Sequence, residues 1–510
     1  MPARAARAQP LARLASGSVT TAERTAPEGQ AYGGGASRPA RRSSNPLLRL
    51  LDDVVSERRA RTGFPPGPSN FDLARTRQMA RDPLPILLSL YERYGPIFSV
   101  RILHSRVVWM LGPEANHYIT VSHPENFHWR DGSFGDLIPL LGDGLLTIDG
   151  AYHDRARRIM MPAFHREQIE AATATMASEA DAALASWSPG ETIDVYHWTR
   201  DLAMRIAMRA LLGLDPDDGG KGKVAAEHFE RALGFYGIDF HRRLLRGPRS
   251  PWRRLTQSRA ILDRIVYAEI AERRAAPDPG RRDILSLLLT ARDEDGSALA
   301  DEEVRDQLMT LMFAGHDTST STLSFMLYEL ARNPRVRVRL GTELDAELGG
   351  RPPSSAAVGG SLPYLDMVLD ETLRLYPPAW VGPRRAVREF EFAGHRVPAG
   401  AYVNYSSWAS HRIPEVFPDP EAFIPERFER EAKAALPRGA YVPFGGGSRI
   451  CIGKRFGQTE VKLVASMILQ RHRLELLPGR TMTIRQMPTL SPEDGLRMAI
   501  RERGAAAAPA

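Results

Sequence analysis

The sequence has almost no cysteine: Cys451 is the single one among 510 residues. A lone thiol excludes an intrachain disulfide, and it excludes zinc sites and iron–sulfur clusters that need several thiolates. Three roles remain for Cys451: a buried thiol without chemistry, a nucleophile, or one axial ligand of a metal. Because the first role is the commonest for an isolated cysteine, the neighbouring residues have to decide between them.

Long apolar runs and blocks of like charge are also missing. No segment is long enough for a secretory signal or a membrane span, so we expect a cytoplasmic protein. The 68 basic residues are nearly balanced by 61 acidic ones. This balance argues against a nucleic-acid partner and favours a modest basic face for an acidic protein.

The first 45 residues are rich in Ala, Arg, Gly, Ser and Pro, and no aromatic residue precedes Tyr32. This composition predicts a disordered leader over 1–45, and the alanine-rich end predicts a flexible tail over 503–510. The first acidic residue of the leader is Glu23. Since arginine-rich, acid-poor leaders are typical of organellar transit peptides, import by the leader stays open as an alternative.

The rest of the chain predicts a single domain over 46–502, mainly α with a minor β portion. Helical spacing dominates Tyr152–Leu214 and the long apolar run Glu302–Arg332. Pro96–Gly112 alternates and is β-branched, which predicts a hairpin. Short strands around a glycine turn are expected in Ala386–Val403, and a further hairpin is expected in Ser491–Arg501.

The segment Phe444–Gly453 reads FGGGSRICIG and surrounds the cysteine. Its three consecutive glycines permit a loop to approach a flat object closely. A helical pattern begins immediately after Gly453, and the amino end of a helix favours negative charge. Arg449 and Lys454 add positive charge nearby, so we expect the metal-binding thiolate form of Cys451 to be favoured.

Phe444, Gly447, Arg449, Cys451 and Gly453 stand at the spacing of a known signature. The segment resembles the haem-binding loop of the cytochrome P-450 family. The resemblance extends from roughly Phe64 to Arg501. It implies that Cys451 is the axial ligand of a haem iron and that the other four residues belong to the haem-binding loop.

A second match is Glu371-x-x-Arg374 in LDETLRLYPP. By itself such a pair is usually solvated and contributes about 0.2–0.5 kcal/mol. It resembles the family's buried pair, which joins an arginine offered here by Arg427 in FIPERF. The resemblance implies a structural triad, and loss of one partner from a buried cluster costs roughly 3–5 kcal/mol.

A third match lies in LMFAGHDTST, residues 311–320. Asp317 and Thr318 interrupt an apolar helix, which leaves two readings: a polar site with a function, or an acid paired with an arginine beside a threonine that caps its own helix. The segment resembles the family's oxygen-activating helix, A-G-x-D-T. This implies that Asp317 and Thr318 organise protons, while His316 is expected to be packed or hydrogen-bonded rather than an iron ligand.

Basic residues that resemble the family's haem-propionate partners form a fourth match. His153 and Arg157 are four apart and share a helical face. Arg384 fits the third partner by spacing, with Arg385 as its rival. Surface positions remain open for these arginines and for Arg158.

The resemblance implies a triangular, mostly helical fold around one haem b, iron protoporphyrin IX. It implies a monooxygenase that inserts one oxygen atom of O₂ into a C–H or C=C bond of a lipophilic small molecule, such as a terpenoid, steroid, fatty acid or polyketide. Pocket residues carried over are Phe313, Ala314, Val381 and Leu490. A peroxide-driven peroxygenase and a non-catalytic haem-binding protein are the alternatives.

Electrons are expected from a separate donor, because the 59 residues after Cys451 (510 − 451) are too few for a reductase domain. We expect a ferredoxin or flavodoxin and its reductase. The docking surface is predicted to display Arg155, Arg158, Arg449, Lys454 and Arg455. A monomer is expected.

Overall fold

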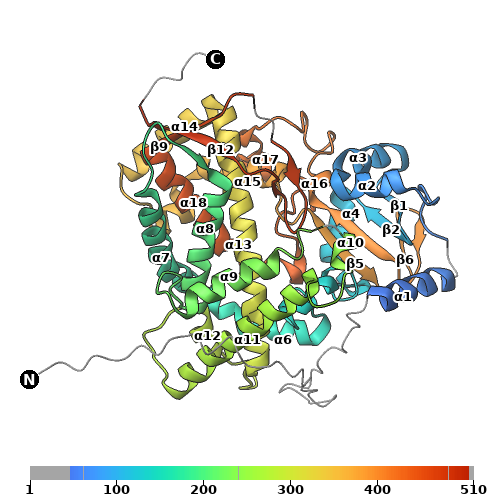
Figure 1. The fold of residues 1–510 in the computed structure, drawn as a ribbon. Helices are drawn as coiled ribbons and strands as arrows, with labels where there is room; N and C mark the ends of the chain where they lie inside the picture. The colour runs from blue at the N-terminus through green and yellow to red at the C-terminus, as the bar shows by residue number, and fades with distance from the viewer. Residues whose placement is uncertain (1–45, 61–62, 239, 480–481, 505–510) are drawn as a thin grey trace, which may run out of the picture.

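The computed structural model describes residues 46–60, 63–238, 240–479 and 482–504, so the leader predicted over 1–45 and most of the predicted tail lie outside the described residues. Helices dominate (Figure 1). They are α1 (Pro46–Arg59), α2 (Leu73–Arg81), α3 (Pro83–Tyr94), α4 (Pro113–His117), α5 (Ile138–Leu141), α6 (Gly150–Met160), α7 (Arg166–Leu184), α8 (Val195–Ala207), α9 (Lys221–Leu233), α10 (Phe240–Arg243), α11 (Pro251–Ala275), α12 (Ile284–Thr290), α13 (Asp301–Arg332), α14 (Pro334–Leu348), α15 (Pro363–Leu375), α16 (Ser407–Ser410), α17 (Arg430–Ala435) and α18 (Lys454–Arg471).

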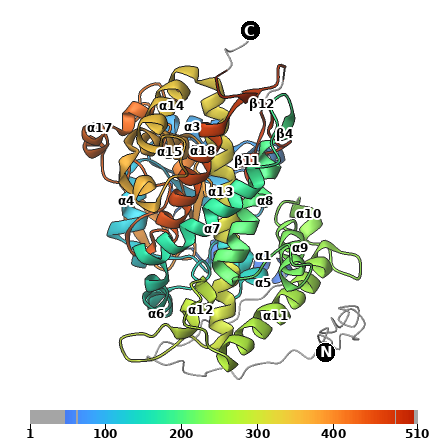
Figure 2. The ribbon, with the colours of Figure 1, turned by 90° about the vertical axis from the view of Figure 1, so that its left-hand side faces the viewer.

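The long helix α13 crosses the middle of the helical part and contacts both α8 and α18 (Figures 1 and 2). It begins with Asp301, Glu302 and Glu303, which suit the positive end of the helix dipole. The Glu303 carboxylate accepts a hydrogen bond from the backbone nitrogen of Ala300 at 2.8 Å. Pro334 lies just past the end of α13 and cannot continue it. The helix is continuous over the predicted Glu302–Arg332 run.

The β portion is small and built from distant segments. Its largest sheet has the order β1-β2-β8-β5-β3, in which β2 and β8 are parallel. A three-stranded sheet has the order β4-β12-β9, and two pairs, β6-β7 and β10-β11, stand apart. The strands are β1 (Ile97–Ile102), β2 (Ser105–Met110), β3 (Phe127–His128), β4 (Thr192–Asp194), β5 (Val381–Ala386), β6 (Phe390–Phe392), β7 (His395–Val397), β8 (Tyr402–Ser406), β9 (His472–Leu476), β10 (Ile484–Arg485), β11 (Ser491–Pro492) and β12 (Arg497–Glu502).

Two of the three local strand predictions are confirmed. β1 and β2 form the hairpin predicted in Pro96–Gly112, and β6 and β7 turn at Gly394, which has a φ of 76°. The hairpin predicted in Ser491–Arg501 is wrong. β11 pairs with β10, whereas β12 pairs with β4 and β9, because these distant strands supply hydrogen-bonding partners on both of its edges.

Two hydrophobic clusters hold the molecule together. The larger one fills the helical part around α13 and α18, and the smaller one lies over the five-stranded sheet. The loop that carries Cys451 leads directly into α18, so it lies where the helical core meets α13. No helix in the described part of the chain is long and apolar enough to span a bilayer.

Candidate functional site

Three positions in the middle of α13 are only partly buried, so unfilled space, here called the internal space, borders the helix there. Between Glu303 and Leu327 every residue of the helix is buried except Ala314, Gly315 and Thr318. A Cβ atom added to Gly315 would meet no other atom within 4 Å. Small side chains and one hydroxyl therefore border the space that a bound molecule would use.

Close backbone packing fixes one side of the cysteine loop. Gly447 has a φ of 59°, and a Cβ there would lie 2.1 Å from the carbonyl oxygen of Thr120. A side chain at this position is excluded both by backbone conformation and by space. The Cys451 nitrogen donates to the carbonyl oxygen of Phe444 at 3.0 Å, which closes the loop just before α18.

Cys451 is exposed on one side, yet the protein around it removes most of the surrounding water. This desolvation raises the pKa of the thiol above its ordinary value, although the Gly453 N–H, Arg157 and Lys454 act in the opposite direction. The expectation that the surroundings as a whole favour the thiolate is therefore wrong. Arg449, which the sequence suggests as a nearby cation, is instead paired with Asp149.

Arg449 binds the segment that precedes α6. Its guanidinium forms an ion pair with Asp149 at 2.7 Å and donates to the carbonyl oxygens of Leu145 and Ile148. Burial lowers the pKa of Arg449 to about 10, although Asp149 opposes this. The residue joins the cysteine loop to the segment that precedes α6.

His153 and Arg157 lie one turn apart on α6. His153 is buried, with Nδ1 at 2.9 Å from a carboxylate oxygen of Asp154, and burial together with Arg449 lowers its pKa to about 4. Arg157 is partly buried and close enough to Cys451 to influence the pKa of the thiol. Arg158 is exposed and forms a surface ion pair with Asp293 at 3.0 Å.

Arg384 and Arg385 have different environments although they are adjacent. Arg385 is paired with Asp53 at 2.6 Å. Arg384 is 2% exposed and donates to the carbonyl oxygen of Pro383, and its guanidinium stacks 3.6 Å from the ring centre of Trp129. Among the described residues no carboxylate forms an ion pair with Arg384. Burial lowers its pKa, and an anionic group would relieve that cost.

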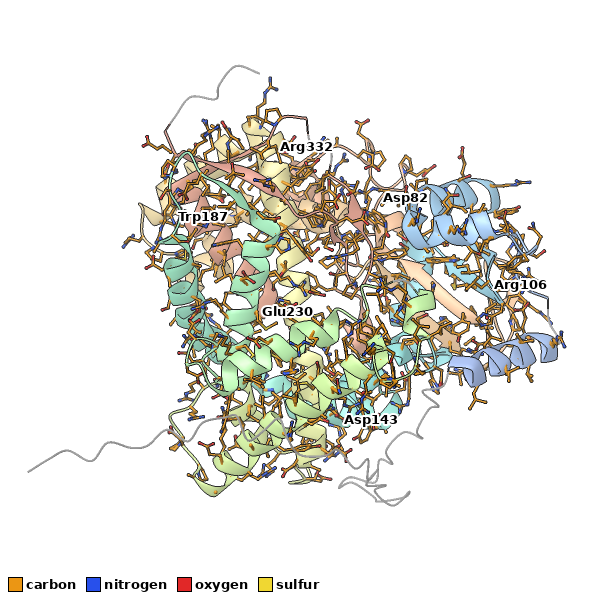
Figure 3. All side chains as sticks on the ribbon, in the orientation of Figure 1. Asp82, Arg106, Asp143, Trp187, Glu230 and Arg332 are labelled. Carbon is orange, nitrogen blue, oxygen red and sulfur yellow. The ribbon has the colours of Figure 1, made fainter. Side chains whose placement is uncertain are left out.

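Asp317 is the buried end of a charged network. Arg200 on α8 binds Asp317 at 2.6 Å and Glu230 on α9 at 2.8 Å. Glu230, labelled on α9 in Figure 3, is 37% exposed in its side chain, so the network reaches from α13 to solvent. Although burial opposes ionisation, His316 and Arg200 lower the pKa of Glu230 to about 2.

His316 is fully buried within the same network. Its Nε2 lies 3.1 Å from a carboxylate oxygen of Glu230 and 3.2 Å from the carbonyl oxygen of Arg200. It is packed and hydrogen-bonded, in agreement with the sequence prediction. Sequence reasoning missed Arg200 and Glu230, because no local pattern links either of them to Asp317.

Thr318 donates a hydrogen bond to the carbonyl oxygen of Ala314, one turn earlier, at 2.5 Å. Thr322 makes the equivalent bond to Thr318 at 2.9 Å but is buried. The two contacts expected if these residues were only structural are thus present: Asp317 is paired with an arginine, and Thr318 caps its own helix. They do not exclude a function, because Thr318 is the hydroxyl that borders the internal space.

Glu371 and Arg374 form a fully buried bidentate pair on α15, with N–O distances of 2.7 and 2.8 Å. Arg374 also donates to the carbonyl oxygens of His411, Pro420 and Ala422. Arg427 lies 3.5 Å from Glu371. The structure therefore brings the predicted triad together and uses it to tie α15 to the loops before the cysteine.

The predicted pocket residues differ in how deeply they are buried. Phe313 is buried next to Ala314, and Val381 is partly buried at the start of β5. Leu490 is fully buried, and its nitrogen donates to the carbonyl oxygen of Pro378 at 3.0 Å. This bond joins the predicted wall at Leu490 to the segment before β5.

The predicted basic docking surface needs correction. Arg155 is 2% exposed and pairs with Glu303 at 3.0 Å, and Arg449 is turned inward to Asp149. Both are therefore excluded from a docking surface, because buried ion pairs are costly to break. Arg158 on α6 is exposed, as is Arg455 on α18, and Lys454 is partly exposed, so these three remain as candidates.

Comparisons with known proteins agree on one family. A family model described as Cytochrome P450 matches residues 63–498. The chain is 36% identical to cyclooctat-9-en-7-ol 5-monooxygenase from Streptomyces melanosporofaciens, over 86% of this chain and 95% of the relative. It is also 36% identical to cyclooctatin synthase from the same organism, over 82% and 91%.

Solved structures of the same family share the fold. Retinoic acid-bound cyanobacterial CYP120A1 superposes with a TM-score of 0.76 at 28% identity, over 86% of this chain and 99% of that one. The haem domain of cytochrome P450DA gives a TM-score of 0.78 at 26% identity, over 87% and 98%.

Proposed function

This chain belongs to the cytochrome P450 family, and on that premise we propose that Cys451 is the axial ligand of its haem iron and that Thr318 and Asp317 manage the protons. The chain is a haem-thiolate monooxygenase, which inserts one oxygen atom of O₂ into a lipophilic small molecule. The residue assignments rest chiefly on one observation: Ala314, Gly315 and Thr318 are the accessible positions in the buried middle of α13.

The residues fit haem b. Cys451 offers an accessible sulfur, and Arg384 is a buried guanidinium without a carboxylate partner among the described residues. His153 and Arg157 would join Arg384 at the two haem carboxylates. Phe444, Gly447, Gly453 and Arg449 would shape the loop below the ring. When bound, the haem supplies the oxidising chemistry, using O₂, two electrons and two protons.

Metal coordination would reverse the protonation of Cys451. The protein alone raises the pKa of this thiol, but a bound metal ion deprotonates a coordinating thiol outright. The Gly453 N–H, Lys454 and Arg157 would then stabilise the negative sulfur that burial disfavours.

The chain's own acids and hydroxyls would move the protons. Glu230 is partly exposed and linked through Arg200 to the buried Asp317. The other carboxylate oxygen of Asp317, Oδ2, is buried and has no hydrogen-bond partner among the described residues, so it would carry a proton from the network to Thr318, its neighbour on α13. The Thr318 hydroxyl would pass a proton into the internal space by giving up its bond to Ala314.

A terpenoid is the substrate class that we propose. Two relatives, each 36% identical, are named cyclooctat-9-en-7-ol 5-monooxygenase and cyclooctatin synthase. Phe313, Ala314, Val381 and Leu490 offer the apolar lining that a largely hydrocarbon substrate needs. Cyclooctat-9-en-7-ol itself is therefore the first compound to test by substrate-binding difference spectra, with a fatty acid for comparison.

The activity needs a redox partner, and we propose that it is an acidic ferredoxin or flavodoxin that meets a monomer in the cytoplasm. Arg455 and Lys454 on α18 are available to such a donor. The retained pair of Asp317 and Thr318 favours this reductive reaction over a peroxide-driven one, because only the reductive reaction consumes delivered protons.

Thr318→Ala tests the proton assignment. The variant should keep the carbon monoxide spectrum of the wild-type protein, since Thr318 is not proposed to hold the haem. It should consume reducing equivalents while product per electron falls at least about tenfold and hydrogen peroxide accumulates.

Thr322→Ala is the matched control, because Thr322 makes the same backbone bond on the same helix but is buried. Its coupling should equal that of the wild-type protein. Full coupling in Thr318→Ala, or equal uncoupling in both variants, would contradict the assignment.

A further inference from the structure

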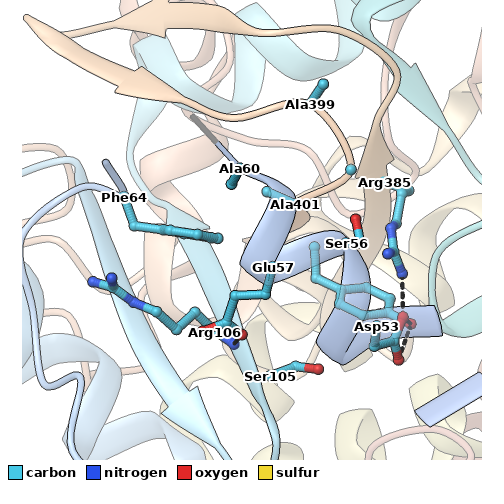
Figure 4. Close-up of a pocket in the computed structure, with 12 residues that line it drawn as sticks. Asp53, Ser56, Glu57, Ala60, Phe64, Ser105, Arg106, Arg385, Ala399 and Ala401 are labelled. Atoms are coloured by element: carbon cyan, nitrogen blue, oxygen red, sulfur yellow. Dashed lines mark hydrogen bonds and ion pairs between the residues drawn. The ribbon is translucent and has the colours of Figure 1, made fainter. Parts of the chain in front are cut away.

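Helix α1 packs against the five-stranded sheet, where it contacts β2, β5 and β8, and its polar side faces the protein (Figure 4). Asp53 is paired with Arg385 at 2.6 Å and accepts hydrogen bonds from Tyr402 at 3.0 Å. Although burial opposes ionisation, His104, Arg385 and Tyr402 lower the pKa of Asp53 to about 2. The carboxylate therefore stays charged and holds the helix down at neutral pH.

A second acid fixes the next turn of α1. Glu57 accepts a hydrogen bond from the backbone nitrogen of Arg106 at 3.1 Å and forms an ion pair with Arg101. Figure 3 shows Arg106 at the same edge of the molecule, beside α1. Ser56 lies so close to Gly400 that a Cβ there would meet the serine oxygen at 2.5 Å. These contacts fix which side of the helix faces outward.

Three apolar side chains lie together on the outward side of α1. Leu48, Leu51 and Val55 are 50%, 57% and 42% exposed, and Arg58 follows them on the same face. Their spacing of three or four residues puts them opposite Asp53 and Glu57. The usual arrangement of a surface helix, with the apolar stripe against the protein, is thus reversed.

Charge indicates what covers this face. Residues 1–45, which lead directly into α1, contain seven arginines and two glutamates. Arg58 adds an exposed cation at the other end of the apolar stripe. A leucine-rich face with cations at both ends matches the boundary between anionic headgroups and acyl chains, whereas a protein partner would have no need of so many arginines.

We propose that α1 binds the surface of an anionic lipid bilayer through Leu48, Leu51 and Val55. The contact is peripheral, and the ion pairs of Asp53 and Glu57 keep the globular part of the molecule attached to the docked helix. It does not depend on the haem or on the residues around Cys451. A bilayer would also hold the lipophilic compounds on which the enzyme acts.

Sedimentation with vesicles tests this contact on the full-length, haem-loaded protein. Vesicles of phosphatidylcholine with roughly one-third phosphatidylglycerol should bind the wild-type chain, and pure phosphatidylcholine should bind it much less. The triple variant Leu48→Gln, Leu51→Gln, Val55→Gln should lose at least about tenfold in binding. Raised salt should weaken binding of the wild-type chain.

Val338→Gln is the control, because Val338 is 65% exposed on α14, far along the chain from α1. Its binding to the vesicles should be unchanged. Equal vesicle binding by the triple variant and the wild-type chain would overturn the proposal. The proposal would also fail if neither chain bound lipid and the triple variant changed the oligomeric state, because the face would then contact a second copy of the chain. It would fail as well if the triple variant lost only stability, because the face would then contact the chain's own leader.

Discussion

Glu460 is a buried acid whose protonation depends strongly on its surroundings. It lies on α18, is 5% exposed, and accepts a hydrogen bond from Ser319 on α13 at 2.8 Å. A cavity of about 10 Å³ lies beside it, enough for roughly one water molecule. Burial raises the pKa of Glu460 to about 8, which the bond from Ser319 reduces only in part.

Glu460→Gln should therefore change how stability depends on pH. In the unfolded chain Glu460 ionises near 4.5, whereas in the folded protein it stays protonated up to about 8. The free energy of unfolding of the wild-type protein therefore falls as the pH rises from about 4.5 to 8. That of the variant does not, because glutamine has no proton to lose. Urea unfolding should show a stability gain for the variant that grows over this window, to an upper limit on the order of 5 kcal/mol.

Glu475→Gln provides the opposite case. The bond from Arg501 lowers the pKa of Glu475, so the wild-type protein gains stability from this group above its unfolded pKa. The variant should be less stable than the wild-type protein at neutral pH, and the difference should shrink in acid.

For Glu460→Gln, an effect on stability that did not depend on pH would contradict the effect of burial on the pKa of Glu460.

At the residue scale, the sequence predicted chemistry where motifs are local. Asp317 and Thr318 could be found because polar groups interrupt an apolar helix. The partners Arg200 and Glu230 could not, since they come from α8 and α9 and have no pattern of their own. The protonation of Cys451 was also missed, because desolvation depends on packing that a local charge count does not describe.

At the scale of elements, the cysteine loop depends on the glycine that fits it against Thr120. Gly447→Ala would force a Cβ to within 2.1 Å of a backbone oxygen at a φ of 59°. We expect a loss of about 1–3 kcal/mol in unfolding free energy, together with weaker haem retention. Urea unfolding and the haem absorbance after dialysis measure the two effects.

Gly457→Ala, inside α18, is the matched control. The nearest atom to a Cβ at Gly457 is the Ser319 oxygen at 3.9 Å, so the methyl group has room. Alanine in a helix interior is better than glycine by about 0.5–1 kcal/mol, so this variant should be slightly more stable. Equal behaviour of the two variants would show that the packing against Thr120 does not hold the loop.

The strand predictions show what local pattern can decide. β1 and β2 are neighbours in sequence, so alternation and a short turn were sufficient to predict them. β12 has the same local pattern but pairs with β4 and β9, which are far away along the chain. The pattern identified a strand there, but nothing local could identify its partners.

At the scale of the whole molecule, the electron donor needs a basic surface close to the cysteine. Arg455→Glu should raise the KM for an acidic ferredoxin severalfold while kcat at saturating donor stays the same. The effect should shrink as salt increases, because exposed charges are screened. Steady-state turnover against donor concentration at two ionic strengths measures it.

Arg497→Glu on β12 is the control, since Arg497 is also exposed but lies on the three-stranded sheet rather than at the start of α18. Its KM for the donor should be unchanged. A shared increase in both variants would indicate an effect of net charge and would contradict a local docking site. Arg155 and Arg449 are unsuitable for this test, because both are buried in ion pairs.

The complete site is assembled from segments spread over the whole chain. The resemblance predicted its members from short motifs, and the structure brings Glu371, Arg374 and Arg427 together as that resemblance implies. Spacing alone did not separate Arg384 from Arg385, whereas the ion pair of Arg385 with Asp53 does. The outward orientation of the apolar face of α1 was not predicted, because the sequence shows that the helix has such a face but not which way the face is turned.

The most direct test of the account is the absorption spectrum of the reduced protein with carbon monoxide. Ligation by the Cys451 thiolate predicts a strongly red-displaced Soret band in the wild-type protein. Cys451→Ser should lose that band, while Thr318→Ala should keep it. A haem-loaded wild-type protein without the displaced band, or a Cys451→Ser variant that retains it, would contradict the central claim.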